Sequence, residues 1–191
     1  MDEKKQLRSR LRQIRREHVA ALPASTRALV LKRPPAPLVS LIPEGMTVSL
    51  YNAIGDEAPT LGWARWLHEN GRSLALPWFA GREAPMTFRR WTDPWDDDAL
   101  EPDPWGARQP DEAAEVVVPD VAVIPLLGFT ARGERIGQGG GHYDRWLAEH
   151  PGVLRIGLGW DCQLVDSLPL EPHDLPLAAV VTPTRFYEGQ T

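Results

Sequence analysis

The sequence predicts an α/β domain with a mostly parallel sheet, flanked by helices in a three-layer arrangement. From residue 46 onward, strand-like and helix-like segments alternate, which is typical of this class. The apolar segment VAVIPLLGF (121–129) has the continuous hydrophobicity of a strand buried on both faces, as in parallel sheets. The chain has 191 residues, 42% of them hydrophobic, which suits one core. We therefore expect a single domain spanning residues 1–191.

The first forty residues are expected to be helical. Residues 3–20 place apolar side chains on one face at helical spacing: Leu7, Leu11, Ile14 and His18. A basic stripe, expected to be a solvated face, runs beside them: Lys4, Arg8, Arg12 and Arg15. A second short helix over 24–32 is followed by the prolines of RPPAP (33–37), which should break the chain.

The remaining elements follow from local patterning. Strands are predicted over these ranges: 46–51, 73–78, 86–91, 121–129, 153–160 and 177–183. Helices are predicted over 58–70, where Gly71 closes the segment, and over 142–150. Residues 92–115 are acidic and rich in Pro and Trp, so we expect a long surface excursion there.

Composition argues against several classes of protein. The net charge is −5, and residues 1–16 carry +5, which leaves −10 on the remainder; binding to nucleic acid is therefore not expected. The N-terminus is charged from Asp2 onward, and Asp120 and prolines interrupt the longest apolar run, so we expect neither a signal peptide nor a membrane span. Cys162 is the one cysteine, which fits a reducing cytoplasm and a small core residue. No histidine has a zinc-site spacing.

The stretch GERIGQGGGHYDRW (133–146) is the strongest candidate for a ligand site. It leads from a buried strand into a helix, at the sheet edge where ligands of α/β proteins collect. Glycines can turn backbone N–H groups inward around an anion, and Arg135 can add a charged fork to a phosphate. The stretch fits neither the dinucleotide fingerprint, because His142 replaces its third glycine, nor the P-loop. The alternative is a loop whose glycines only satisfy turns.

Asp144 follows this stretch directly. A carboxylate repels phosphates unless a cation lies between them, and Mg²⁺ is commonly held by one or two carboxylates together with phosphate oxygens. The alternative is an acid in the first turn of a helix, where the helix dipole favours it.

GFTARGERIGQGGGHYDRWL (128–147) resembles the signature of the 5-formyltetrahydrofolate cyclo-ligase family. Further segments resemble the family in its order: KKQLR (4–8), YNAIGDEAPT (51–60) and RIGLGWDCQLVDSLPLEPHDLPLAAVVT (155–182), with its His-Asp pair. The resemblance implies a fold shared with sugar-phosphate isomerases and CoA transferases. It also implies conversion of 5-formyltetrahydrofolate to 5,10-methenyltetrahydrofolate with ATP and Mg²⁺, releasing ADP and phosphate.

The resemblance carries site residues with it. It implies ATP binding by Lys4, Lys5, Gln6, Leu7, Arg8, Arg135, Ile136, Gly137, Gln138, Gly139, Gly140, Gly141, His142 and Tyr143. It implies folate binding by Asn52, Glu57, Gln138, Gly139, Gly140, Gly141 and His142, and Mg²⁺ binding by Asp144 and Asp174. Arg135 and Asp144 would support phosphoryl transfer, with no catalytic nucleophile. The partner would be a folate, with or without a polyglutamate tail, and the protein a monomer.

Departures from the family pattern leave other interpretations open. His142 stands where the family has Tyr, Gly140 where some members have Lys, and Leu127 at a family Gly. Trp78 is the tryptophan best placed by sequence to stack on the pterin. A sugar-phosphate or CoA enzyme on the same fold would use Glu57 as base or nucleophile. A non-catalytic folate- or nucleotide-binding protein would not need Asp144 or Asp174.

Overall fold

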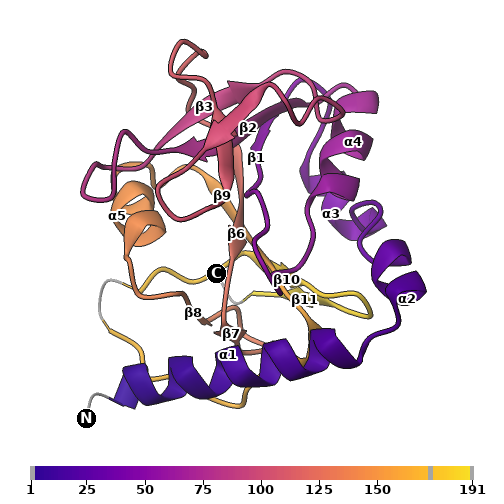
Figure 1. Cartoon of the computed structure of the whole chain (residues 1–191). Helices are drawn as coiled ribbons and strands as arrows, with labels where there is room; N and C mark the ends of the chain where they lie inside the picture. Colours follow the sequence, from indigo (N-terminus) through magenta and orange to yellow (C-terminus); the bar gives the residue numbers. More distant parts are fainter. Residues whose placement is uncertain (1–2, 172–173, 190–191) are drawn as a thin grey trace.

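A computed structural model describes residues 3–171 and 174–189, and its centre is a seven-stranded sheet (Figure 1). In the described part of the chain the strand order is β11-β10-β9-β6-β1-β2-β3. The bounds are β1 Thr47–Ser49, β2 Ser73–Trp78, β3 Thr87–Trp91, β6 Val121–Pro125, β9 Leu154–Leu158, β10 Ala179–Val181 and β11 Phe186–Glu188. The five inner strands are parallel, and the edge strands β3 and β11 are antiparallel to their neighbours. The predicted mixed α/β class is confirmed.

Helices and two small hairpins surround this sheet. The helices are α1 Glu3–Ala21, α2 Ala24–Leu29, α3 Ala36–Leu41, α4 Leu61–Glu69 and α5 His142–Glu149, with a 3₁₀ turn, η1, over Asp161–Gln163. The hairpins pair β4 Leu100–Pro102 with β5 Arg108–Pro110, and β7 Gly128–Phe129 with β8 Arg135–Ile136. Within the described residues, no helix is long and apolar enough to cross a membrane.

The layers follow from the two buried faces of the sheet. On β6, Val123 packs in one hydrophobic cluster with Trp63 of α4. The next residue, Ile124, points to the opposite face and packs with Trp146 of α5. Both strand residues are fully buried, as expected for a central strand of a parallel sheet with helices on both sides.

Helix α1 lies across the carboxyl ends of the central strands, along the lower edge in Figure 1. Its residue Leu11 is 2% exposed and packs against Leu127 and Ile136, just beyond the end of β6. A Cβ on Gly128 would lie 2.8 Å from Leu11 Cδ1, so this close approach requires glycine. The docking places the polar face of α1 beside the glycine-rich stretch.

One expectation about local structure was wrong, and others were incomplete. The strand predicted over 121–129 ends at Pro125, and the chain then enters the β7–β8 hairpin. The prolines of 33–37 separate α2 from α3, as expected, and Pro35 is also the N-cap of α3, where a proline is tolerated. The excursion 92–115 contains the β4–β5 hairpin, and β11 adds a last strand after the predicted one. The short antiparallel pieces are stabilised by pairing, which single-strand patterning does not reveal.

Candidate functional site

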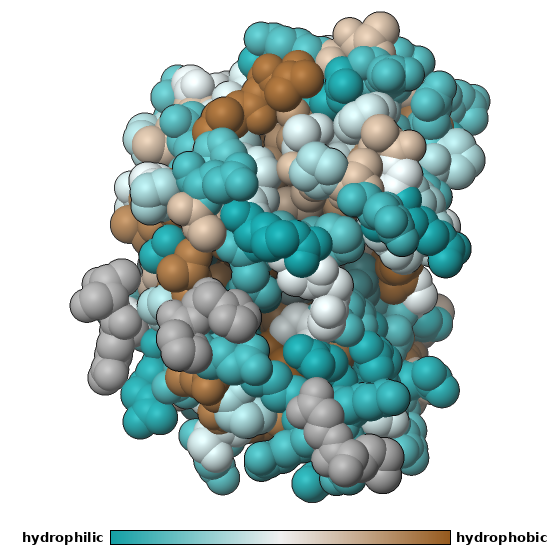
Figure 2. Space-filling model, turned by 90° about the vertical axis from the view of Figure 1, so that its left-hand side faces the viewer, coloured by the Kyte–Doolittle hydropathy of each residue, from teal (hydrophilic) through white to brown (hydrophobic). Residues whose placement is uncertain are grey.

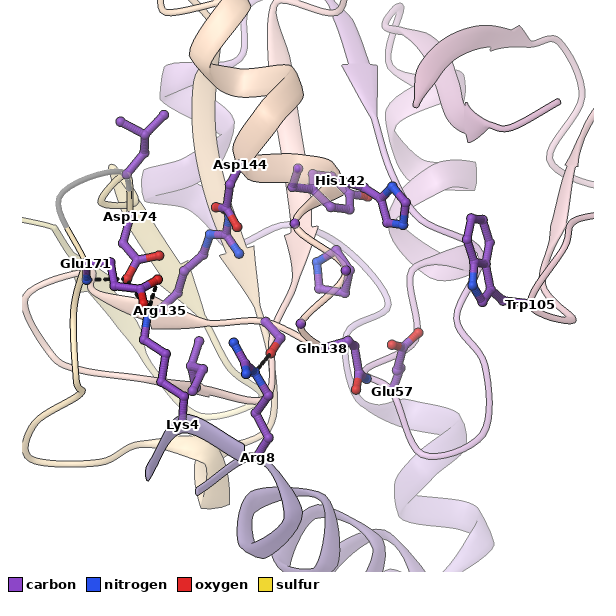
Figure 3. A pocket seen from close by; sticks show the side chains of 18 of the residues that line it. Lys4, Arg8, Glu57, Trp105, Arg135, Gln138, His142, Asp144, Glu171 and Asp174 are labelled. Atoms are coloured by element: carbon purple, nitrogen blue, oxygen red, sulfur yellow. Dashed lines mark hydrogen bonds and ion pairs between the residues drawn. The ribbon is translucent and has the colours of Figure 1, made fainter. Parts of the chain in front are cut away.

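A cavity of about 700 Å³ opens at the carboxyl edge of the sheet (Figure 3). Segments that follow three adjacent parallel strands reach it: Pro125 ends β6, Phe79 follows β2, and the loop 54–57 follows β1. The face drawn in Figure 2 is mostly hydrophilic and is hollowed near its middle. The lining includes Lys4, Arg8, Ile54, Glu57, Phe79, Trp105, Arg135, the residues 136–144, Glu171 and Asp174.

The glycine-rich stretch forms one wall, and its backbone turns in ways that favour glycine. Gly139 has φ +105° and Gly141 has φ +66°, a left-handed region that favours glycine. Arg8 Nε donates a hydrogen bond of 3.1 Å to the Gly137 carbonyl, so α1 holds the outer side of the loop. In the described structure, the backbone N–H groups of residues 138–141 donate to no protein acceptor. Such a row of open donors, directly before a helix N-terminus, is suited to an anion.

Two pairs of opposite charges stand beside this wall. Lys4 Nζ lies 2.8 Å from Glu171 Oε2 and 3.0 Å from Asp174 Oδ2. Burial lowers the pKa of Lys4, but its bonds to Glu171 and Asp174 outweigh that effect, and the net pKa is raised. Arg135, nearly buried, donates to Asp144 Oδ1. The structure thus brings both predicted metal-binding acids to one cavity and pairs each with a predicted phosphate-binding cation.

Magnesium coordination at this place would need ligands from outside the protein. Among the described residues, no group of three or more acidic, histidine or cysteine side chains could hold a metal alone. Asp144 and Asp174 offer two carboxylates on the same cavity. Mg²⁺ typically takes one or two carboxylates and completes its octahedron with phosphate oxygens and water. The residues therefore fit a metal that arrives with phosphates.

Glu57 faces the cavity from the loop after β1. Its Oε2 accepts a hydrogen bond of 3.1 Å from the Ile54 N–H. Burial raises the pKa of Glu57, and the hydrogen bond from Ile54, the charge of Arg15 and the amide of Gln138 only partly offset this effect. The loop is tied down by Tyr51, whose hydroxyl donates 2.7 Å to the Ala58 carbonyl.

Arg15 of α1 supports the same loop from below. It is 5% exposed, and its Nη2 lies 3.1 Å from Asp56 Oδ1. Trp160 Nε1 donates 2.9 Å to the Asp56 carbonyl. The expectation that the basic stripe of α1 is a solvated face is therefore wrong at Arg15, because the helix packs its C-terminal half against the loops.

Three aromatic rings form the far wall. Phe79 lies 4.5 Å from Trp105 and 5.1 Å from His142 between ring centroids, and Trp105 lies 5.1 Å from His142. Burial, and then the charge of Arg145, lower the pKa of His142, which favours the neutral ring. Edge-to-face contacts of this kind leave ring faces available to a flat ligand.

The structure places a different tryptophan at the cavity from the one that the sequence favoured. Trp78 lies outside the cavity lining that the described residues form, and its ring faces the Arg89 guanidinium at 4.0 Å. Trp105 lines the cavity, although it sits in the turn of the β4–β5 hairpin and is 40% exposed. No local pattern distinguished it from Trp95, another exposed tryptophan in the same segment.

Other predicted residues lie apart from the cavity lining. Lys5 and Gln6 are exposed on α1, and Leu7 packs against the cluster around Leu11. Asn52 is half-buried after β1, outside the lining. Their roles in binding remain predictions. His173, the partner of Asp174 in the sequence motif, lies outside the described residues.

Solved structures share the fold of this chain. A 5,10-methenyltetrahydrofolate synthetase from Aquifex aeolicus aligns with a TM-score of 0.73 at 23% identity, over 97% of this chain and 95% of that chain. A Mycoplasma pneumoniae protein of the same description aligns with a TM-score of 0.67 at 22% identity, over 94% and 98%. At this identity the likeness establishes the fold.

The sequence comparisons establish the family. The profile of the 5-formyltetrahydrofolate cyclo-ligase family matches residues 1–183. The Escherichia coli K12 enzyme of that name is 48% identical over 71 residues, so the matched part spans 36% of this chain and 39% of that protein. The Mycolicibacterium smegmatis enzyme is 30% identical over 150 residues, 74% of this chain and 75% of its own. The chain belongs to the 5-formyltetrahydrofolate cyclo-ligase family.

Proposed function

We propose that this protein converts 5-formyltetrahydrofolate to 5,10-methenyltetrahydrofolate with ATP, which leaves as ADP and phosphate. The observation that carries the proposal is the division of one cavity. Open backbone donors and cations stand at one wall, and a half-buried carboxylate with three aromatic rings stands at the other. This arrangement suits a triphosphate on one side and a flat heterocycle with N–H donors on the other.

The reaction needs positioning more than covalent chemistry. The formyl oxygen attacks the γ-phosphorus of ATP, and the bond to ADP breaks. Nitrogen 10 then attacks the activated formyl carbon and loses its proton, and phosphate departs with the former formyl oxygen. Phosphoryl transfer of this kind depends on alignment and charge neutralisation, so no nucleophilic side chain is required. Cys162 suits no such role, because burial raises the pKa of its thiol to about 11.

The nucleotide wall supplies alignment and positive charge. The N–H groups of residues 138–141 can donate to phosphate oxygens, while Arg8 holds the loop through Gly137. Lys4 and Arg135 are two cations that line the same cavity. Before ligands enter, each lies against a carboxylate, which lowers the cost of burying its charge.

Mg²⁺ is part of this proposal. Asp144 and Asp174 would hold it, and the ion would neutralise charge on the phosphate oxygens. With the acids on the metal, Lys4 and Arg135 would be released from their ion pairs and would be available to the phosphate oxygens.

The folate wall supplies recognition. Glu57 is an acceptor of two N–H donors when ionised, which matches the amino group and ring N–H of a pterin. Phe79, Trp105 and His142 offer ring faces against which the pterin or the benzoyl ring can pack. A cytoplasmic location, a monomeric state and acceptance of a polyglutamate tail belong to the same proposal.

One spectrophotometric experiment tests the proposal. Purified protein with 5-formyltetrahydrofolate, ATP and Mg²⁺ should form the methenyl product and ADP in equal amounts. Omission of ATP should stop the reaction. Folded protein that binds ATP but gives no product at any magnesium concentration would contradict the proposal. Absence of nucleotide binding would instead favour a sugar-phosphate or CoA enzyme.

A further inference from the structure

Arg12 of α1 makes a two-pronged contact with the glycine-rich stretch that no catalytic role requires. Its Nε donates 3.0 Å to Gln138 Oε1, and its Nη2 donates 3.1 Å to the Gln138 backbone carbonyl. The two residues are 126 positions apart in the sequence. A guanidinium holding both the side chain and the backbone of one residue fixes that residue's rotamer, because both prongs come from one planar group.

This contact determines which way the Gln138 amide points. A guanidinium has only donors, so the amide atom that faces Arg12 must be the oxygen. The NH₂ group is then turned to the other side, where Glu57 lies (Figure 3). The amide of Gln138 holds the pKa of Glu57 down, which agrees with a donor facing the carboxylate.

Glu57 depends on such support because it is half-buried and its carboxylate is partly shielded from water. The groups that influence Glu57 come from several elements. Gln138 belongs to the glycine-rich stretch, Arg15 to α1 and Asp56 to the same loop as Glu57. Tyr51 follows β1, and Tyr143 lies in α5. Asp56 raises the pKa of Glu57, whereas Arg15 and Gln138 lower it. Of these groups, Gln138 and Tyr143 also belong to the nucleotide wall, and Gln138 is the one whose amide lowers the pKa of Glu57.

We propose that Arg12 is a positioning residue for the folate site: it orients Gln138 so that the amide supports the ionised Glu57 carboxylate. This inference rests on the proposed function. Helix α1 then connects the two walls. Arg8 holds the backbone of the glycine-rich stretch, and Arg12 orients the Gln138 side chain of that stretch toward Glu57. The chain of contacts runs from Arg12 through Gln138 to Glu57.

The test compares Arg12→Met with Arg10→Met, which removes an equal charge from an exposed position of the same helix. Arg12→Met should raise the KM and Kd for 5-formyltetrahydrofolate about threefold to tenfold, as expected for one lost hydrogen-bond network. The KM for ATP should change less than twofold, because Arg8 still holds Gly137. As the pH falls, the variant should also lose folate affinity at a higher pH than the wild type, because the pKa of Glu57 is no longer lowered by the Gln138 amide. Arg12→Lys should recover part of the loss, and Arg10→Met should behave as the wild type.

A double-mutant cycle separates positioning from a general effect on the helix. If Arg12 acts through Gln138, then Arg12→Met should add nothing once Gln138→Met is present. The inference would be overturned by additive losses of folate affinity in the double variant, by equal losses of ATP and folate affinity in Arg12→Met, or by an unchanged folate KM. In each case, normal turnover by the wild type would leave the proposed function standing. A wild-type protein that binds no folate would overturn both.

Discussion

The two walls of the cavity are built in different ways. The proposed nucleotide wall is largely one continuous stretch of chain, residues 135–144, in which backbone donors and adjacent charges would bind the phosphates. The folate wall gathers side chains from three further segments, Glu57, Phe79 and Trp105, and shares His142 with the nucleotide wall. A wall built from one stretch of chain can be predicted from the sequence. A wall built from residues far apart in the chain can be recognised only once the fold is known. The two walls should also fail differently when single residues are changed.

The largest effect is expected at Asp144. Asp144→Asn keeps the size of the side chain but removes the charge that pairs with Arg135 and would bind Mg²⁺. Turnover should fall about a hundredfold to a thousandfold, the range typical of losing one electrostatic contact to the transition state. ATP binding without metal should hold or improve slightly, because a negative charge near the phosphates has gone and Arg135 is released.

Magnesium titration of turnover, with calorimetry of metal-free ATP binding, checks this result. Asp120→Asn is a matched control, because Asp120 is exposed and bonds the Thr47 N–H away from the cavity. If Asp144→Asn keeps near-normal turnover with an unchanged magnesium requirement, then Asp144 is only a first-turn helix acid.

A comparable but smaller loss is expected at Gly139. With φ at +105°, a β-branched side chain is strained there, and a Cβ would lie 3.4 Å from the Arg8 guanidinium carbon. Gly139→Val should weaken ATP binding by about tenfold to a hundredfold, because valine disfavours this left-handed backbone and adds bulk beside the loop and Arg8. Gly45→Val has a similar φ of +86° with no atom within 4 Å of its Cβ, so it reports strain alone. Equal ATP affinities in the two variants, measured by calorimetry, would show that the loop is no cradle.

At Glu57 the effect should fall on the folate wall alone. Glu57→Gln should weaken folate binding about tenfold to a hundredfold, as for a hydrogen bond to a charged group, and leave ATP affinity nearly intact. The pKa of Glu57 is raised mainly by burial, so wild-type folate affinity is present at high pH and is lost as the pH falls through that raised pKa. The variant should lose this pH dependence. Equal loss of ATP and folate binding would show that Glu57 lies at a different site.

The same raised pKa predicts a gain in stability for the variant. A carboxyl with a raised pKa in the folded protein costs stability once the pH rises through its unfolded value, near 4. Glu57→Gln removes that cost, so its Tm should equal or exceed the wild-type Tm at pH 7. The difference should vanish below about pH 4, where the unfolded carboxyl is protonated too. A lower Tm at pH 7 would mean that the ionised carboxylate stabilises the free protein.

The sequence alone predicted that the glycine-rich stretch lines a ligand site, because the residues that indicate such a site are neighbours in the chain. The glycine stretch, Arg135 and Asp144 are contiguous, and the alternation around them predicted the parallel sheet and its carboxyl edge. The sequence did not indicate Trp105. The pattern of 92–115 is acidic and irregular, and nothing in it indicates that a hairpin folds back over the end of β2. Likewise, the role of Arg15 depends on packing against a loop 41 residues away.

Trp105 gives the smallest predicted effect and the clearest test of a wall built from residues far apart in the chain. The hairpin is docked by Gln109, which is buried and bonds both backbone groups of Phe79: its Oε1 accepts 2.9 Å from the N–H, and its Nε2 donates 3.2 Å to the carbonyl. This docking holds the indole in place although it is 40% exposed.

Trp105→Ala should therefore raise the folate Kd about threefold to tenfold, the worth of one aromatic contact, with ATP affinity unchanged. Trp95→Ala, similarly exposed at 47% but outside the lining, should change neither. Because the ring is not needed for the core, the Tm of Trp105→Ala should stay close to that of the wild type. Stopped-flow quenching of tryptophan fluorescence by folate would follow both variants; equal quenching amplitudes in the wild type and Trp105→Ala would place the ligand away from this ring.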